Sequence, residues 1–269
     1  MTSPYVQSVF QAVPSTGFSS TDLRIPLVFN GHGSSSKNEK ALKWLTGISF
    51  VNTNSSDATV TVEYTAYNGY TNTCTGTIPA NGSGVWYAPE AGTASSIFTC
   101  TGGPISWSYP GPTYGSVKVT SNVGVLAIAN SNRYDTGAGL GAGYSSLAAA
   151  PSQATYRAVC PLAFNKDAST DWLTGIQAAN VGSITTDIKF TMVKAGLDPS
   201  SNSVVITKSS VSAGSSASAY FPEESSAFTN FEGAVFVEAT DTSAKISVSS
   251  SNTNYNTLGA AALYDCINY

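Results

Sequence analysis

The sequence predicts an all-β protein: two β-sandwich domains in tandem, preceded by an N-terminal extension. One stretch occurs twice, since residues 26–30 (PLVFN) and 44–48 (WLTGI) return as residues 161–165 (PLAFN) and 172–176 (WLTGI). Self-similarity on this scale indicates a duplicated structural unit. Helical periodicity is nearly absent, and about seven short alternating stretches per copy, bounded by turn residues, favour a sandwich.

The match between the copies runs the length of a domain. Beyond the first stretch, residues 59–62 answer to 187–190, Gly115 answers to Gly233, and the pair Ser131-Asn132 answers to Ser251-Asn252. The alanine-rich residues 148–152 are expected to be a linker. We therefore expect an extension over residues 1–21, a first domain over residues 22–149 and a second over residues 156–269.

Alternation of apolar and polar residues assigns the faces of the strands, because successive side chains of a strand point to opposite sides. The last core strands of the first copy are expected over residues 117–119 and 123–129. Ile48, Phe50 and Asn52 are expected to share one face of their strand, opposite Ser49 and Val51. The residues expected to point inward are Val60, Val62 and Tyr64, and in the second copy Ile188, Phe190 and Met192.

Four cysteines fall two to a copy. Three pairings are open in principle, and the repeat boundary favours Cys74 with Cys100 and Cys160 with Cys266, because each bond then lies within one domain. Buried thiols are the alternative. If formed, the disulfides point to an oxidising, extracellular compartment.

Composition narrows the range of partners. Only 10% of the residues are charged, against about 25% in ordinary soluble proteins, which suits an extracellular or assembled structural protein. The net charge of -4 provides no basic patch for a nucleic acid. No run of apolar residues is long enough to span a membrane.

Candidate residues for chemistry are scattered. His32 is the sole histidine, so a solvated loop residue is preferred to a catalytic or metal role. The glycine-rich residues 137–143 do not open a βαβ unit, which favours a turn over a dinucleotide loop. The pairs Asp167/Asp171 and Glu223/Glu224 lack the spacing of a calcium loop. We expect no enzyme activity, cofactor or metal.

Two segments present candidate interaction residues. The extension carries apolar residues that fit a short amphipathic helix or a strand, and it either packs on its own chain or adds to the sheet edge of a neighbour. These residues are Val6, Val9, Phe10 and Val13. The first copy also has an unmatched aromatic and proline-rich loop with Trp107 and Tyr109, for binding, subunit contact or local packing. For the repeated Trp44 and Trp172 a buried structural role is preferred to sugar stacking.

Together, the WLTGIxxxN signature, the alternating TVTV strand, the Gly-Ser turn and the GSVxV strand resemble the immunoglobulin-like β-sandwich repeats of secreted prokaryotic surface proteins. The resemblance covers the two copies and implies an extracellular structural or adhesive role without catalytic residues. The leading hypothesis is a cell-surface subunit that polymerises with copies of itself into a filament, pilus or surface layer. Alternatives are an adhesin module that binds glycans or another surface, and a virion or tail-fibre protein, which the lack of a signal-peptide pattern permits.

Overall fold

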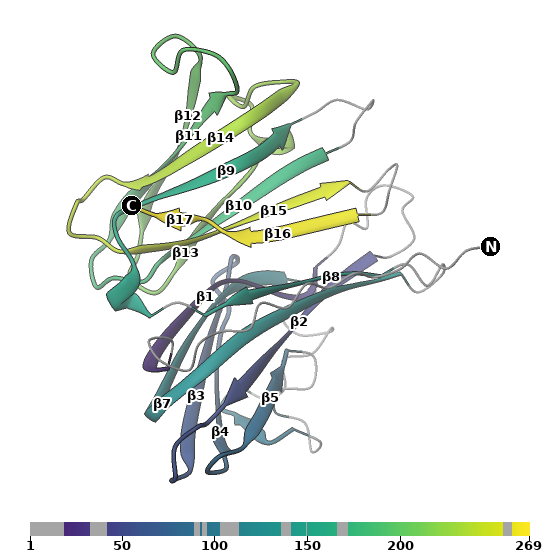
Figure 1. Ribbon diagram of the computed structural model, residues 1–269, viewed down its shortest axis with the longest axis vertical. Coiled ribbons are helices and arrows are strands. Elements are labelled where there is room, and N and C mark those ends of the chain that lie inside the picture. The colour runs from purple at the N-terminus through teal and green to yellow at the C-terminus, as the bar shows by residue number, and fades with distance from the viewer. Residues whose placement is uncertain are drawn as a thin grey trace. The chain divides into compact units, whose positions relative to one another are not determined.

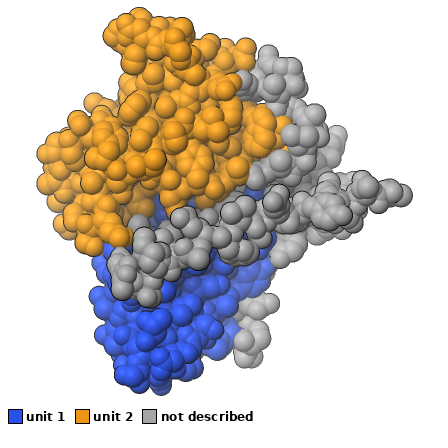
Figure 2. Space-filling view, in the orientation of Figure 1, with its two compact units in different colours: residues 1–150 blue, residues 151–269 orange. Residues whose placement is uncertain are grey.

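The computed structural model describes residues 19–32, 42–88, 92, 96–102, 113–135, 141–148, 150–165, 172–254 and 260–269 (Figure 1). The chain divides between Ala150 and Pro151 into two compact units, coloured separately in Figure 2. This division falls within the alanine-rich stretch expected to be a linker. The regular structure of the described ranges is strand, apart from two 3₁₀ turns, η1 (Pro151–Gln153) and η2 (Phe221–Glu223). The all-β prediction is confirmed.

Unit 1 contains one antiparallel sheet of eight strands that folds over into two layers. The first layer has the order β6-β4-β3-β7-β1 and the second β5-β2-β7-β8. Strand β7 belongs to both layers, because its first half pairs with β1 and β3 and its second half with β2 and β8. The strands are β1 (Ser20–His32), β2 (Leu42–Val51), β3 (Ala58–Ala66), β4 (Thr71–Ile78), β5 (Ser83–Tyr87), β6 (Phe98–Cys100), β7 (Thr113–Asp135) and β8 (Gly141–Leu147).

Unit 2 follows the same plan with nine strands. Its layers have the orders β12-β11-β14-β9-β17 and β13-β10-β15-β16, and one residue pair, Leu173 with Asn165, links β10 to β9. The strands are β9 (Arg157–Asn165), β10 (Trp172–Asn180), β11 (Thr186–Lys194), β12 (Ser203–Val211), β13 (Ser216–Tyr220), β14 (Phe231–Ala239), β15 (Ile246–Asn254), β16 (Ala260–Asp265) and β17 (Ile267–Asn268).

The continuous strand β7 differs from the two separate strands predicted in the first copy, and unit 2 explains the difference. Eight residue steps separate Val119 from Ala127, whereas eleven separate the equivalent Val237 and Val248. The extra residues of unit 2 make a turn around Asp241, whose carbonyl oxygen accepts a hydrogen bond from the N–H of Ala244. Without them, β7 passes from one layer to the other uninterrupted.

The order of the last strands also departs from what the immunoglobulin resemblance implies. In immunoglobulin domains the sixth and seventh strands belong to the same sheet. Here the sixth and seventh strands of unit 2, β14 and β15, lie in different layers, and the first strand β9 takes the place beside β14. The short turn between β14 and β15 carries the chain across the sandwich instead of back along the same sheet.

The six residues predicted to point inward lie in the two cores, and the three predicted to share one face of β2 are buried with them. All nine are at most 1% exposed, whereas Val51 on the opposite face of β2 is 41% exposed. The layers of unit 1 meet through aromatic side chains: the ring centroids of Tyr64 in β3 and Trp86 in β5 lie 6.4 Å apart. Such rings contribute the largest apolar areas to a core of this size.

The repeated tryptophans pack on the phenylalanines of the preceding repeated stretch. The rings of Phe29 and Trp44 are stacked with centroids 5.5 Å apart, and those of Phe164 and Trp172 lie 6.0 Å apart. Trp44 is buried and Trp172 is half-buried. Trp44 thus has the buried packing role that was preferred, whereas Trp172 packs on its phenylalanine but stays partly exposed.

The threonine of the signature holds neighbouring strands together. The N–H of Phe29 donates to Oγ1 of Thr46 at 2.9 Å, and the N–H of Phe164 donates to Oγ1 of Thr174 at 2.7 Å. Both threonines are fully buried. Each hydroxyl therefore accepts the hydrogen bond of a backbone N–H at the corner where the first strand of the unit, in one layer, meets the second strand, in the other layer.

The partners of these threonines correct the alignment of the two copies. Thr46 lies opposite Ser131 and Thr174 lies opposite Asn252, and each pair is hydrogen bonded, at 2.6 and 2.5 Å. Ser131 is thus equivalent to Asn252, one residue beyond the predicted Ser251. A shift of one residue places a side chain on the opposite face of a strand. The serine-asparagine pairs of the two copies therefore do not occupy equivalent positions, and their identity is a coincidence.

The asparagine of the signature holds two turns at once. The side-chain Nδ2 of Asn52 lies within hydrogen-bond distance of three backbone carbonyl oxygens, at 2.8, 3.1 and 3.3 Å, and Nδ2 of Asn180 donates to two at 2.6 and 3.0 Å. The acceptors are Ser56, Pro79 and Ile78 in unit 1, and Ile184 and Val211 in unit 2. Both side chains are buried, so these hydrogen bonds fix the loops on either side of the third and fourth strands.

Candidate interaction site at a sheet edge

Each disulfide joins two cysteines of the same unit, one disulfide in unit 1 and one in unit 2. Cys74 is bonded to Cys100 and Cys160 to Cys266, the pairs that the repeat boundary predicted. They occupy different places in the shared plan, because Cys74 lies in β4 at one edge of the first layer and Cys160 lies in β9 near the other. The position of the disulfide therefore differs between the units, whereas the hydrogen bonds of the signature threonine and asparagine are common to both.

The second disulfide closes the end of the chain onto its own unit. Cys266 stands between β16 and β17, and β17 pairs with β9 through Ile267 opposite Val159. The first and last strands of unit 2 are thus neighbours, as expected for Cys160 and Cys266. This short strand covers the edge of β9.

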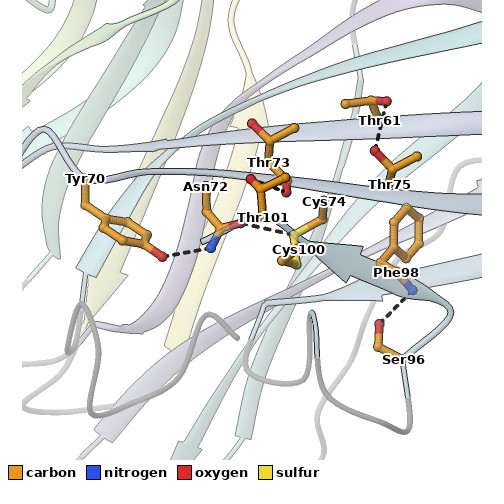
Figure 3. The surroundings of a disulfide bond; sticks show 10 residues. All are labelled: Thr61, Tyr70, Asn72, Thr73, Cys74, Thr75, Ser96, Phe98, Cys100 and Thr101. Carbon is orange, nitrogen blue, oxygen red and sulfur yellow. Dashed lines mark hydrogen bonds between the residues drawn. A yellow bond between two sulfur atoms is a disulfide. The ribbon is translucent and has the colours of Figure 1, made fainter. Parts of the chain in front are cut away.

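The first disulfide fastens an additional strand to the edge of unit 1 (Figure 3). Among the described strands, β6 pairs only with β4, and Cys100 lies directly opposite Cys74. Just beyond β6, the N–H of Thr101 donates to the carbonyl oxygen of Thr73 at 2.9 Å. The edge of β4 in unit 1 is thereby covered by a strand from the same chain.

A phenylalanine of this strand completes the core. Phe98 lies opposite Gly76 and is 1% exposed, and its ring centroid is 5.8 Å from that of Phe50. A β-carbon on Gly76 would lie 2.8 Å from Cδ1 of Phe98, closer than such atoms approach. Glycine at this position therefore makes room for the side chain that β6 inserts.

The equivalent edge of unit 2 has no such cover in the described residues. Ile206 in β12 takes the place of Cys74, because Ile206 lies opposite Phe190 as Cys74 lies opposite Val62. Strand β12 is nine residues long, ends its sheet and pairs only with β11 among the described strands. Val205, beside Ile206, is 49% exposed. A row of backbone groups along an open edge is a template for another strand.

A single charge lies on this edge. Lys208 occupies the place of Gly76, and its Nζ lies 2.6 Å from Oε1 of Glu224. Glu224, one of the two glutamates considered for calcium, is thus engaged in an ion pair. The rest of β12 is serine, threonine, valine and isoleucine.

Several of the predicted site residues lie outside the described ranges. This holds for the interaction candidates Val6, Val9, Phe10, Val13, Trp107 and Tyr109, and for the loop aspartates Asp167 and Asp171. The backbone of His32 ends β1, so this residue closes a strand instead of lying wholly in a loop. Residues 141–143 of the glycine-rich run begin strand β8.

The shifted titratable groups of the described ranges are explained by packing and turns. Burial raises the pKa of the Tyr64 and Tyr264 hydroxyls, since it disfavours the charged form. Hydrogen bonds from Ser200 and Ser243 lower the pKa of Asp198 and Asp241 in exposed turns. Among the described residues no group of three His, Cys, Asp or Glu is placed to hold a metal ion.

Comparison of the sequence with protein-family models and with curated proteins finds no match. In the described part of the chain, no helix has the length and apolar character needed to cross a membrane.

Sequence reasoning did not identify the open edge of β12. The available signal was the length of one connection, which runs from Pro89 to Tyr114 in the first copy and is shorter in the second, from Pro222 to Phe231. The longer segment contains β6, which covers β4. A short connection in the second copy leaves the corresponding strand as the last of its sheet.

Proposed function

We propose that this chain is a non-enzymatic extracellular structural subunit that polymerises into a filament, pilus or surface layer. The observation that carries the proposal is the network common to both units: the tryptophan, threonine and asparagine of the signature all serve to hold strands and turns together. What is duplicated is therefore a scaffold. Two scaffold units in one chain suit a building block whose role lies in its contacts with others.

Three further features support an extracellular location. Each unit contains an internal disulfide, and such bonds persist in oxidising compartments. The surface is poor in charge and rich in hydroxyl groups: β4 presents Thr71, Thr73, Thr75 and Thr77 on one face, and β3 contributes Thr59, Thr61 and Thr65 beside them. The resemblance of the signature to repeats of secreted prokaryotic surface proteins points the same way.

The polymer would form by donation of the part of the N-terminal extension that precedes β1, residues 1–18, to the sheet edge of the next copy, because Ser20 and Thr21 belong to β1 of their own unit. Strand addition of this kind uses main-chain hydrogen bonds for affinity and alternate side chains for specificity. The contact is heterologous, since donor and acceptor are different surfaces. Such contacts generate open fibres when the rotation between successive copies does not close into a ring.

Electron microscopy of the purified full chain, and of a variant that lacks residues 2–18 and keeps all of β1, tests the proposal. We expect filaments or sheets from the full chain and dispersed particles from the deletion variant, which should keep both disulfides. Assembly that survives the deletion contradicts strand donation. A full chain that stays dispersed at high concentration contradicts polymerisation itself.

A second candidate function is a glycan- or surface-binding adhesin module centred on Trp107 and Tyr109. The observation that favours it is the anchoring of β6, because Cys100 is tied to Cys74 only a few residues before these aromatic residues. Glycan-array binding lost in Trp107→Ala and kept in Trp86→Phe, together with a monomeric protein in solution, would favour the adhesin over the polymer.

A further inference from the structure

We propose that strand β12 of unit 2 is the acceptor edge, and that it takes the N-terminal extension of a neighbouring copy as an added antiparallel strand. The inference rests on the proposed function and names the strand at which the contact between copies would form. Its basis is a comparison of the two units: the edge of β4 is covered by β6, and the equivalent edge of β12 has no partner strand among the described residues.

The hydrogen-bond pattern of unit 1 shows which backbone groups the edge offers. Just before β4, the N–H of Ala66 donates to the carbonyl oxygen of Tyr70. Hydrogen-bonded pairs alternate along an antiparallel ladder, so every second residue after Tyr70 uses its backbone groups to bond to β3. Thr73 and Thr75 then present their backbone groups to the outside. The bond from the Thr101 N–H to the Thr73 carbonyl agrees with this assignment.

The same parity holds in unit 2. The N–H of Lys194 donates to the carbonyl oxygen of Asn202, which places Val204 and Ile206 in hydrogen-bonded pairs with β11. The backbone groups of Val205 and Thr207 therefore point outward, and these residues are equivalent to Thr73 and Thr75. Unit 1 demonstrates that the fold accepts an extended segment at these two positions.

The extension has the length and composition that this edge requires. Residues 5–13 (YVQSVFQAV), between Pro4 and Pro14, contain no proline, glycine or charged residue and equal the nine residues of β12 in number. Alternate positions place Val6, Ser8, Phe10 and Ala12 on one face, three of them apolar, as is Phe98, which β6 places inward. The ion pair of Lys208 with Glu224 leaves no unpaired charge along β12 to oppose an uncharged strand.

A proline at position 205 tests the acceptor. Proline lacks an N–H, and it is tolerated on an edge strand where that N–H faces outward, so Val205→Pro removes a donor needed by an added strand and spares the ladder to β11. We expect the critical concentration for assembly of the full chain to rise about tenfold or more, equivalent to about 1.4 kcal/mol. Val205→Thr, which keeps the N–H, should assemble as the wild type does. Circular dichroism checks that both variants fold.

Hydrogen exchange locates the contact separately. A synthetic peptide of residues 2–18, added to the chain that lacks them, should slow exchange of the Val205 and Thr207 amides. Protection there without filaments of the full chain would uphold the acceptor and refute polymerisation. Filaments that depend on residues 2–18 and are unchanged in Val205→Pro would refute the acceptor and uphold strand donation. Protection of β12 in the deletion variant without peptide would mean that a second β12 occupies the edge, which overturns the proposed occupant.

Discussion

Gly115 and Gly233 occupy the same place in the two units, and in both the strand beside them comes too close for any side chain. A β-carbon on Gly115 would lie 2.1 Å from the carbonyl oxygen of Thr65, and one on Gly233 would lie 2.1 Å from that of Val193. The contacting atoms are backbone, so they cannot rotate away. At this point the residue that follows the neighbouring strand, Tyr67 in unit 1, turns to donate its N–H to the carbonyl oxygen of Tyr114.

The first prediction concerns these glycines. Gly115→Ala and Gly233→Ala should each destabilise the protein by about 1–3 kcal/mol or more, because the added carbon forces the strands apart. Gly47→Ala and Gly175→Ala are matched controls in β2 and β10, where the nearest atom to an added carbon lies at 3.5 Å, an ordinary contact. Urea unfolding measures all four. Equal stability of the test and control variants would contradict the close approach.

The second prediction concerns the asparagine of the signature. Asn180→Ala should cost about 1–3 kcal/mol, because the carbonyls of Ile184 and Val211 lose their side-chain donor inside the protein. Asn180→Asp should cost more at neutral pH, since a carboxylate faces two carbonyl oxygens in place of an amide donor. Protonation restores a donor, so the deficit of the aspartate variant should shrink at acidic pH. Urea unfolding at pH 7 and pH 4 distinguishes these outcomes from a merely steric role, which would make aspartate the milder change.

The third prediction ranks the disulfides. Loop-closure entropy makes a crosslink more stabilising when it spans more residues. The sequence separation is 26 for Cys74–Cys100 and 106 for Cys160–Cys266, which corresponds to about 3.5 and about 4.8 kcal/mol. Replacing both cysteines of a pair by alanine should therefore cost more for Cys160–Cys266. The difference in unfolding free energy between the two double variants is the measurement, and the reverse order would show that strand β6 depends on its crosslink for more than chain entropy.

Much of the fold was predictable because the local patterns are strong and occur twice. Alternation in residues 58–66 and 186–194 assigned the buried faces of β3 and β11 correctly. The disulfide pairs followed from the position of the repeat boundary. These inferences required only the period of a strand and the assumption that each copy closes on itself.

The remaining features depend on partners that are distant in sequence. Ser131 is equivalent to Asn252 because each lies opposite the signature threonine of its unit. The sequence alone aligns Ser131 with Ser251, because a serine-asparagine pair occurs in both copies. The passage of β7 between layers depends on three residues that only unit 2 possesses. The open edge of β12 is visible only once β6 is seen on β4, because an edge is a property of strand order and carries no local pattern.

The fourth prediction concerns pH. Tyr64 is 1% exposed against Trp86, and burial raises the pKa of its hydroxyl above the ordinary value of 10.0. Above about pH 10 the unfolded chain loses this proton while the folded chain retains it. The unfolded state then binds fewer protons, so the free energy of unfolding falls as the pH rises. The contribution of Tyr64 is complete below pH 10 and is lost progressively above it.

Tyr64→Phe removes the titrating group and keeps the ring against Trp86. Between pH 9 and pH 11 the wild type should lose about 1.4 kcal/mol more unfolding free energy than Tyr64→Phe, the value for one proton over the final pH unit. Amide hydrogen exchange in β3 follows unit 1 directly, and urea unfolding gives the total. Parallel pH profiles of the two proteins would mean that the hydroxyl reaches water in the folded state, and the packing of the two layers around Tyr64 would then be looser than the ring contact with Trp86 indicates.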